Sequence, residues 1–315
     1  MKVSVITPVY NAAEFVTRAV ESALAQPEVA EVLLVEDGSP DGSLAVCLAL
    51  AERYEKVKLL RHPGGVNRGA GASRNLGMRN ASCEFIGFVD ADNFYLPGRF
   101  TVAHEIFERI SDCEGVYETI GNYVQDDAGL QRWLNARREP DKLTGLSQPV
   151  EPAELASKLI LGGLGGLTLD GLVLKRNVIE KAGYMAENLR LHQDTDFIIR
   201  AALVSKLYPG RLDEPVALRG VHDHNRLSAP RSAMQEYRNR MAYWMSLYRW
   251  VKAKGKMMDQ KAVLTGMIQY TKVHKYFRSF PLKYFPVRLV WGVRLLRLIF
   301  YPEVIFDLVK GRITG

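Results

Sequence analysis

The sequence predicts an α/β fold, a Rossmann-like mixed sheet flanked by helices, followed by a basic helical appendage. Short apolar runs alternate with segments of helical periodicity over the first hundred residues. Charge is uneven, because residues 1–230 hold 25 Lys and Arg against 31 Asp and Glu, whereas residues 231–315 hold 17 against 4. The 315 residues, 47% hydrophobic and 24% charged, suffice for one large domain or two modest ones. We therefore expect three parts, residues 1–93, 94–230 and 231–315.

Four short runs in the first part, rich in Val, Ile, Leu and Phe, indicate buried strands. Three segments between them have the apolar spacing or the Ala and Leu content of helices. This alternation implies right-handed crossovers and a parallel sheet covered on both faces. The expected strands are Val3–Ile6, Val32–Glu36, Val57–Leu60 and Phe85–Val89, and the expected helices are Phe15–Leu24, Ser43–Tyr54 and Gly71–Asn80.

The second part is less regular. A helix is expected over about Pro97–Arg109 and a strand over Val116–Val124, while the polar stretch Asp126–Lys142 is expected to be exposed. The run Leu161–Leu167 has four glycines in seven residues, too many for a helix interior. It is either a mobile loop over the site or a tight packing turn.

The cysteines and the start of the chain bear on the compartment. Cys47, Cys83 and Cys113 are odd in number and lack paired metal-ligand spacing, which argues against a disulfide framework or a zinc site. Lys2 is followed at once by the strand-like Val3–Ile6, which leaves no room for a signal peptide. We expect a cytoplasmic protein.

Two carboxylates, Asp90 and Asp92, flank one small residue directly after the apolar run Phe85–Val89. In an open α/β sheet, ligands bind outside the carboxyl ends of the strands, so carboxylates there can hold a divalent cation against a phosphate-bearing substrate. The alternative is a solvated turn.

Two further strand ends carry polar turns. The first strand ends in Thr7–Asn11, and the second in Glu36–Gly42. An aspartate at a strand end can accept hydrogen bonds from a base imide or a ribose hydroxyl, which makes Asp37 a candidate ligand, although Asp37-Gly38 could equally be a simple turn. Asp41 is expected to cap the next helix.

The segment Asn67–Gly77 is glycine-rich and basic at the start of a helix. Its backbone N–H groups and the guanidinium groups of Arg68 and Arg74 are suited to phosphate oxygens. It does not fit the P-loop or the GxGxxG fingerprint, and a flexible turn with solvated arginines is the alternative.

Together and in this order, four motifs resemble the family-2 glycosyltransferases, the inverting sugar transferases of the GT-A fold. They are Thr-Pro-Val-Tyr-Asn, Glu-Asp-Gly-Ser, Asn-x-Gly-x-x-x-x-Arg-Asn-x-Gly and Asp-Ala-Asp. Glu36 stands where many relatives have Asp. The resemblance extends to about Ser228 and makes residues 1–93 the nucleotide-binding half and residues 94–230 the acceptor-binding half.

The resemblance implies roles for individual side chains. Those that would surround the base and ribose are Pro8, Tyr10 and Asp37, with Arg74 near the nucleotide. Asp90 would approach the ribose and the metal, and Asp92 would be the main protein ligand to Mn or Mg.

The segment His192–Phe197 resembles the family's Glu-Asp motif, whose Asp is the catalytic base, and Gln193 here replaces the Glu. If a helix begins at Gln193, Asp194 precedes an inward stripe of Phe197, Ile198, Ala201 and Ala202 and faces the interior side. Asp196 lies four residues before Arg200, the spacing of a surface salt pair.

The segment Val221–Ser228 resembles the family's closing segment, in which a His is followed by Asn-Arg-x-Ser. Here His222 is the better match. A neutral imidazole can ligate Mn or contact a phosphate, so His222 is a candidate metal ligand, whereas His224 is expected to be an ordinary surface histidine.

The basic appendage contains an apolar stretch, Tyr284–Val309, interrupted by charges and bounded in its middle by Pro286 and Pro302. A membrane-spanning helix is therefore not expected. The pattern favours an amphipathic helix on an anionic membrane surface or, equally, a helix packed on protein. Nucleic acid is not an expected partner, because no binding motif is present.

These features predict a metal-dependent, inverting glycosyltransferase, cytoplasmic or peripheral on the cytoplasmic membrane face. It would move a sugar from a nucleotide sugar, UDP-linked by family frequency, to a hydroxyl of a glycan or lipid-linked acceptor. Asp194 would deprotonate the acceptor while a Mn or Mg cation stabilises the departing diphosphate. The alternatives are an inert nucleotide-sugar-binding scaffold and a sugar-nucleotide pyrophosphorylase, the latter lacking its Gly-rich N-terminal motif.

Overall fold

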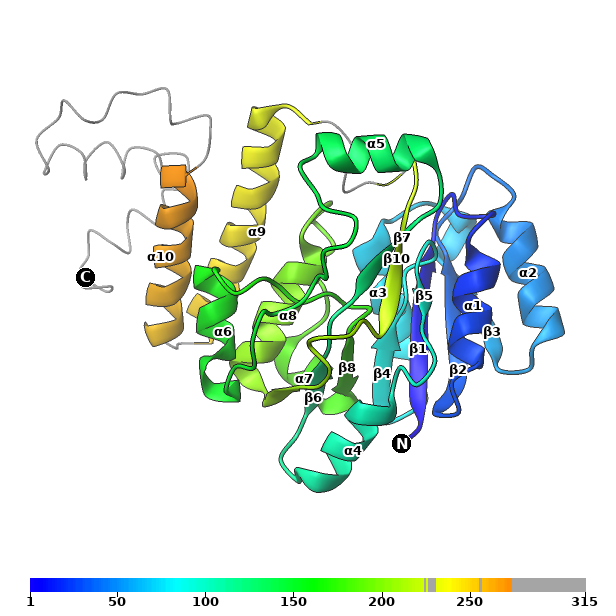
Figure 1. Cartoon of the computed structure of the whole chain (residues 1–315), viewed down its shortest axis with the longest axis horizontal. Coiled ribbons are helices and arrows are strands. Elements are labelled where there is room, and N and C mark those ends of the chain that lie inside the picture. Colours follow the sequence, from blue (N-terminus) through cyan, green and yellow to red (C-terminus); the bar gives the residue numbers. More distant parts are fainter. Residues whose placement is uncertain (224, 226–230, 255–256, 274–315) are drawn as a thin grey trace, which may run out of the picture. The chain divides into compact units, whose positions relative to one another are not determined.

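The computed structural model describes residues 1–223, 225, 231–254 and 257–273, and the chain divides into two compact units at Pro230. The first unit is built on a seven-stranded mixed sheet of order β3-β2-β1-β4-β8-β6-β9 (Figure 1). The α/β fold with a mixed sheet flanked by helices is as predicted.

Four parallel strands form one half of this sheet. They are β1 (Val3–Val9), β2 (Val29–Glu36), β3 (Val57–Arg61) and β4 (Phe85–Phe88), and the helices between them are α1 (Val16–Leu24), α2 (Ser43–Arg53) and α3 (Ala70–Asn80). Each predicted strand and helix of residues 1–93 is present, with bounds shifted by a few residues.

The other half of the sheet reverses direction. Strand β8 (Leu172–Lys175) is antiparallel to both β4 and β6 (Gly115–Tyr117), and β9 (Leu207–Pro209) is parallel to β6. The single strand predicted over Val116–Val124 was wrong, because the chain leaves the sheet after Tyr117 and enters a second one at Gly121.

That second sheet has three strands in the order β5-β10-β7. Strand β10 (Ala217–Val221) lies between antiparallel β5 (Phe94–Tyr95) and parallel β7 (Gly121–Val124). Because β5 follows the predicted metal motif and β10 precedes His222, this small sheet brings two distant parts of the site together.

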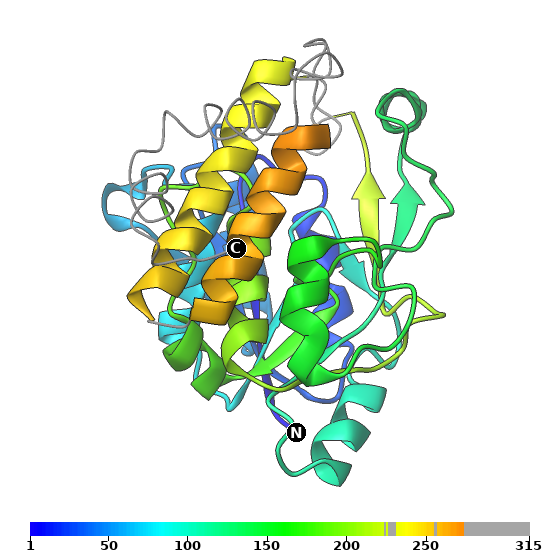
Figure 2. The same cartoon turned by 90° about the vertical axis from the view of Figure 1, so that its left-hand side faces the viewer.

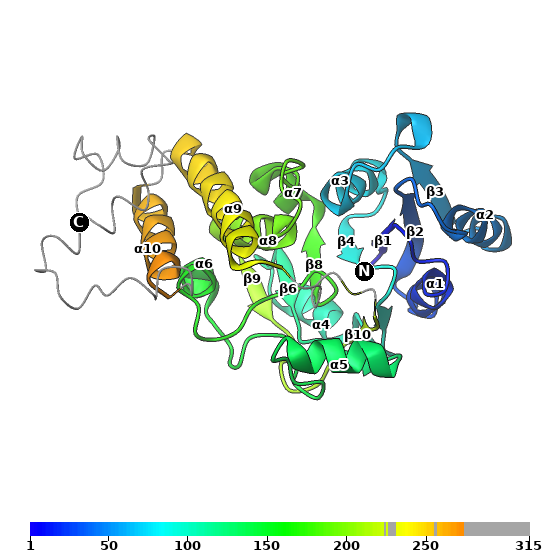
Figure 3. The ribbon, with the colours of Figure 1, turned by 90° about the horizontal axis from the view of Figure 1, so that it is seen from above.

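Helices cover both faces of the large sheet, as the alternation of side chains along a strand requires. Val3 and Val5 of β1 are buried in a cluster with residues of α1, α2 and α4 (Thr101–Arg109), whereas Ile6 is buried in a second cluster on the other face. That second cluster includes residues of α3, α6 (Pro152–Leu161), α7 (Arg176–Ala182) and α8 (Gln193–Val204). Figure 3 shows α1 and α3 on opposite sides of the parallel strands.

Two segments of the second part differ in detail from expectation. The polar stretch 126–142 contains helix α5 (Asp127–Asn135), and Trp133 within it is only 2% exposed, so the stretch is not simply solvated. In the glycine-rich run, Gly165 has φ +102°, and a Cβ there would lie 2.1 Å from the carbonyl oxygen of Gly145. That close approach is the packing turn which the sequence left as one of two options.

The described residues of the second unit include two helices, α9 (Ala233–Ala253) and α10 (Met257–Val273), which lie alongside each other (Figure 2). A capping box between Ser232 and Gln235 begins α9. The rings of Tyr237 and Tyr270 stack across the pair with centroids 6.3 Å apart. The apolar stretch Tyr284–Val309 lies outside the described residues. Among the residues described, no helix is long and apolar enough to cross a membrane.

Candidate functional site

The predicted nucleotide motifs meet at one edge of the large sheet. Strands β1, β2 and β4 are parallel, so their carboxyl ends lie together, and the N–H of Asp37 donates to the carbonyl of Val9 at 2.8 Å. Beyond β1, Pro8 is half-buried and Tyr10 is 51% exposed, which leaves the ring of Tyr10 open to solvent.

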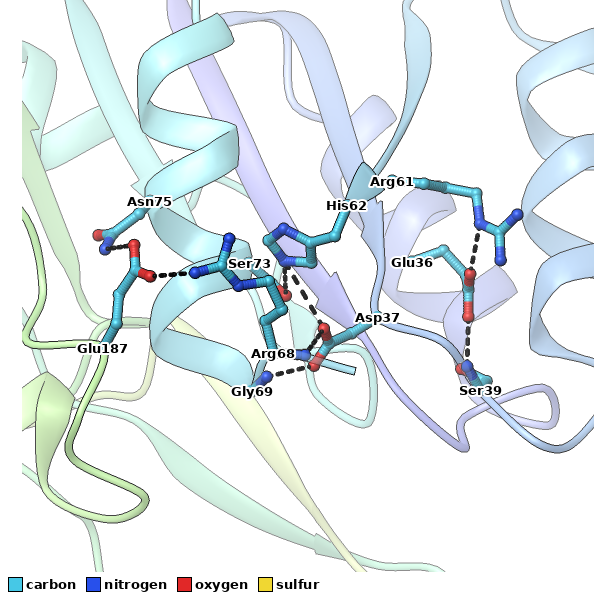
Figure 4. Close-up of polar contacts among 10 residues, drawn as sticks. All are labelled: Glu36, Asp37, Ser39, Arg61, His62, Arg68, Gly69, Ser73, Asn75 and Glu187. Carbon is cyan, nitrogen blue, oxygen red and sulfur yellow. Dashed lines mark hydrogen bonds and ion pairs between the residues drawn. The ribbon is translucent and has the colours of Figure 1, made fainter. Parts of the chain in front are cut away.

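Asp37 is tied to the loop that starts α3 (Figure 4). Its two carboxylate oxygens accept hydrogen bonds from the backbone N–H groups of Arg68, at 2.7 Å, and Gly69, at 2.8 Å. His62 Nε2 lies 3.6 Å from the same carboxylate and 3.1 Å from Ser73 Oγ. Asp37 is only 2% exposed. The carboxylate therefore organises the start of the glycine-rich segment.

Glu36, which stands where the family resemblance expects Asp, points away from Asp37 (Figure 4). It accepts from the N–H of Ser39 at 2.6 Å and pairs with Arg61 at 2.8 Å. Burial by itself would raise the pKa of Glu36, but these partners outweigh burial and lower it. The longer side chain thus fixes the turn after β2. The N-cap of α2 is Gly42 and not Asp41 as expected, although Asp41 accepts from the N–H of Ser43 in the first turn at 3.0 Å.

A second network joins α3 to the segment that leads into α8. The amide of Asn75 donates to the carbonyl of Met185 at 2.9 Å and accepts from its N–H at 2.8 Å. Glu187 accepts from Asn75 at 3.0 Å and from Arg68 at 3.2 Å (Figure 4). Farther on, a Cβ at Gly71 would lie 3.2 Å from Cγ of Gln193. Hydrogen bonds and close packing therefore fix the glycine-rich segment to the segment before Asp194.

Arg74 connects the two groups of candidate carboxylates. Its guanidinium, 6% exposed, pairs directly with Asp90. Burial alone would lower the pKa of Arg74, but the charges of Asp90 and Asp194 outweigh burial and raise it. One buried cation thus pairs with the predicted metal motif and also lies within range of the charge of the predicted base.

Sequence reasoning missed Asp170, a buried carboxylate that binds the backbone of the predicted metal motif. Its Oδ1 accepts from the N–H of Asp90 and from the side chain of Asn93, both at 3.0 Å. Burial and the neighbouring Asp90 charge raise the pKa of Asp170 to about 6. The only sequence signal was a lone carboxylate in the apolar run before β8, which does not by itself indicate a partner.

Asp92 meets the residues that follow β10. His222 Nε2 lies 3.2 Å from Asp92 Oδ2, and the amide of Asn225 lies 3.4 Å from the same oxygen. The imidazole is 7% exposed and packs on the ring of Phe15 at 4.5 Å between centroids. Three predicted residues, Asp90, Asp92 and His222, therefore lie in one neighbourhood, whereas His224 is outside the described residues.

Asp92 and His222 offer two ligand types to a divalent cation. In the part of the chain that is described, no group of three His, Cys, Asp or Glu side chains is arranged to hold one. The 3.2 Å between Asp92 Oδ2 and His222 Nε2 is close to the roughly 3 Å that separates neighbouring ligands at 2.0–2.1 Å in an octahedron. A carboxylate oxygen suits Mn²⁺ or Mg²⁺ when substrate phosphates complete the shell, whereas an imidazole nitrogen suits Mn²⁺ better than Mg²⁺, which prefers oxygen ligands. This pair fits a cation that is shared with a diphosphate.

The predicted base lies at the start of α8. Asp194 is half-buried, and its Oδ1 accepts from the N–H of Thr195 at 2.8 Å. The inward stripe of the helix is buried as predicted, at Phe197, Ile198, Ala201 and Ala202.

The expectation for Asp196 was wrong in one respect. It pairs with Arg200 at 2.7 Å as the spacing predicted, but both side chains are buried, not solvated. Arg200 also donates to the carbonyl groups of Ala182 and Tyr184 at the end of α7. Helix α7 packs against this face of α8, so the Asp196–Arg200 pair is a buried ion pair that links α8 to the residues at the end of α7.

Comparisons with known proteins agree with this geometry. The model of the family "Glycosyl transferase family 2" matches residues 4–143. The succinoglycan biosynthesis protein ExoU of Rhizobium meliloti is 41% identical over 97 residues, which are 31% of this chain and 28% of ExoU. The chain thus spans under a third of the length of ExoU. The uncharacterized glycosyltransferase alr2836 of Nostoc is 27% identical over 95% of this chain and 88% of the length of alr2836.

Among solved structures, the chain resembles residues 1–349 of TarS from S. aureus in complex with UDP-GlcNAc. The TM-score is 0.63 at 19% identity, covering 90% of this chain and 77% of that one. At this identity the likeness concerns the fold. Residues 4–143 of the chain match the model of glycosyl transferase family 2, and the chain has the GT-A fold.

Proposed function

We propose that the chain transfers a sugar from a nucleotide sugar, UDP-linked in preference, to a hydroxyl of a glycan or lipid-linked acceptor, with inversion at the anomeric carbon. The observation that carries the proposal is the position of Arg74. This buried guanidinium pairs with Asp90, and the charges of Asp90 and Asp194 both raise its pKa. The donor-side carboxylate and the candidate base thus both act electrostatically on one buried cation, which supports placing them in a single site.

The nucleotide would bind at the carboxyl ends of β1 and β2. Tyr10 is exposed there, Pro8 lies beside it, and Asp37 holds the loop of Arg68 and Gly69. The UDP-GlcNAc bound to the structural relative TarS supports UDP as the first nucleotide to test. Arg74 would lie near the donor beyond Asp90.

Asp92 and His222 would hold a Mn or Mg cation, with Asp90 next to them. When bound, the cation neutralises charge on the departing diphosphate. Asp92 keeps 31% of its side chain exposed beside the buried imidazole, so a ligand can reach its carboxylate without opening the core.

Asp194 would be the general base. A single displacement needs the acceptor hydroxyl on the face of the sugar opposite the diphosphate, with a carboxylate in reach of its proton. Asp194 accepts from the N–H of its neighbour Thr195 and is half-buried, which leaves the carboxylate available to an acceptor. The name of the relative ExoU, a succinoglycan biosynthesis protein, supports a polysaccharide precursor as acceptor.

A thermal-shift panel of UDP, GDP and their sugars, with and without Mn²⁺, tests the donor assignment. We expect UDP and at least one UDP-sugar to raise the melting temperature more with Mn²⁺ than without it, since a ligand that binds only the folded state stabilises it. Transfer is then assayed by release of UDP with candidate acceptors. Binding of UDP-sugars without transfer to any acceptor would favour the scaffold. Exchange of diphosphate into a nucleoside triphosphate would favour the pyrophosphorylase.

A further inference from the structure

Helix α5 approaches the backbone at His222 more closely than side chains allow. A Cβ at Gly129 would lie 2.5 Å from Cα of His222 and 2.6 Å from its carbonyl carbon. Real Cβ atoms do not approach backbone atoms to this distance, so a residue with no side chain is needed for the contact. The position of the helix and the position of His222 are therefore coupled.

Two charged side chains of this region hold the next residue, Asp223. Arg132 Nε lies 2.8 Å from Asp223 Oδ1, and another nitrogen of the guanidinium donates to the carbonyl of Asp223. Asp126, which caps α5 by accepting from the N–H of Gly129 at 2.6 Å, accepts from the N–H of Asp223 at 3.3 Å through its other oxygen. Both backbone groups of Asp223 and its carboxylate are thus bound by the helix.

The helix has its own anchor in the small sheet. Trp133 is 2% exposed, and the guanidinium of Arg219 on β10 lies over its ring at 5.9 Å. The N–H of Gln125, just before the helix, donates to the carbonyl of Val221 at 2.9 Å. These contacts fix α5 to the strand that ends at His222.

We propose that α5 is a positioning helix for the donor site, in which Gly129, Asp126 and Arg132 hold the backbone of His222 and Asp223 so that the imidazole stays beside Asp92. The effect of this positioning on donor binding rests on the function proposed above. None of the three residues touches the reacting atoms in this scheme. They act through His222.

The variant Gly129→Ala distinguishes a positioning role of α5 from a purely local role, because the two roles predict opposite effects of the added methyl group. Alanine is a better helix former than glycine, so Gly129→Ala should strengthen an isolated α5. If the helix positions His222, the same methyl group displaces the backbone there. Gly166→Ala is the matched control, because Gly166 lies in the same half of the chain and a Cβ there meets nothing within 4 Å.

The main test uses Arg132→Gln in the full chain, with Arg137→Gln as its control. Both changes remove one positive charge from the same region, but Arg137 is exposed at the end of the helix, whereas Arg132 reaches Asp223. The first readout needs no ligand. It is the rate at which diethyl pyrocarbonate modifies His222, mapped by mass spectrometry.

We expect His222, which is 6% exposed, to react several-fold faster in Arg132→Gln and Gly129→Ala than in either control. The second readout is the affinity for UDP by calorimetry. The gain in affinity that Mn²⁺ confers should fall about tenfold, at the lower end of the range for groups that support metal ligands. The Mn²⁺-free affinity should not change, and in a His222→Ala background Arg132→Gln should have no further effect.

Equal modification of His222 in Arg132→Gln and Arg137→Gln would overturn the proposal. So would a loss of UDP affinity that persists at full size in the His222→Ala background, because the helix would then act by another route. If the unaltered chain binds no UDP with Mn²⁺, the proposed function fails. The modification rates still decide whether α5 positions His222.

Discussion

His222 and Asp92, which are 130 positions apart in the sequence, lie side by side with Nε2 of the imidazole 3.2 Å from Oδ2 of the carboxylate. The contact joins the end of β10 to the turn after β4, and the small sheet makes it possible by pairing β10 with β5. Because the carboxylate is 31% exposed and the imidazole 7%, a ligand reaches Asp92 first. Because of this difference in exposure, Asp92 is the better position for a substitution that tests ligand binding.

Asp92→Asn should remove the Mn²⁺-dependent part of UDP binding and leave the fold intact. A carboxamide has no charge for the cation, and the residue is partly exposed, so little core packing is lost. Calorimetry with and without Mn²⁺ measures the effect, which we expect to be at least on the order of tenfold. Asp213→Asn, at an exposed position, is the control. Unchanged UDP affinity of Asp92→Asn with Mn²⁺ present would favour the solvated turn over a metal site.

The candidate site could be predicted from the sequence where its residues follow strand ends. Asp37 directly follows strand β2, Asp90 and Asp92 lie in the turn after strand β4, and parallel strands place such residues on one edge. Asp170 could not be found in this way. Its contact with Asp90 spans 80 positions and depends on the antiparallel insertion of β8, which no local pattern indicates.

Asp196→Asn should destabilise the chain and not merely alter a surface. Removing one partner of a buried pair leaves the other charge uncompensated, at a cost of about 3 kcal/mol. The control is Asp112→Asn, which breaks an exposed pair with Lys206 and should cost less than about 1 kcal/mol. Urea unfolding followed by circular dichroism compares them. Equal urea midpoints for the two variants would mean that the buried Asp196–Arg200 pair does not stabilise the fold more than the exposed pair does.

Glu31 gives a pH dependence with a definite sign. Burial by itself would raise its pKa, but hydrogen bonds from Lys58, Ser4 and Ser82 outweigh burial and lower it to about 2. A lowered pKa means that the stabilisation is present above the unfolded value, near 4.5, and is lost as the pH falls from there towards 2.

Glu31→Gln should therefore cost about 2 kcal/mol at pH 7, a figure reduced because Lys58 is largely exposed. The difference from the unaltered chain should shrink as the pH falls from 5 to 3. Urea midpoints at several pH values measure it, with the exposed Glu105→Gln as control. A difference that stays constant with pH would show that the carboxylate's charge is not what stabilises the fold.

The fold of residues 1–93 could be predicted because its strands are apolar runs that alternate regularly with segments of helical spacing. The later part could not, since β6, β7 and β8 have only three or four residues and do not stand in such a regular alternation. Asp196 illustrates the same limit, because its spacing to Arg200 indicated the pair but not the covering helix α7. For Tyr284–Val309, contact with a membrane surface and packing on protein both stay predictions.

Asp194→Asn separates catalysis from binding. The carboxamide keeps an oxygen for the N–H of Thr195, which donates at 2.8 Å, so the start of α8 should be unchanged. It cannot accept the proton of an acceptor hydroxyl, and transfer should fall at least on the order of the 10²–10⁴-fold typical of a lost general base. Affinity for UDP-sugar should stay within about twofold, because Arg74 keeps its pair with Asp90. Calorimetry and UDP release under saturating donor measure the two quantities. Turnover at the native rate would place the base elsewhere, and Asp196 would not replace it, since that carboxylate is buried against Arg200.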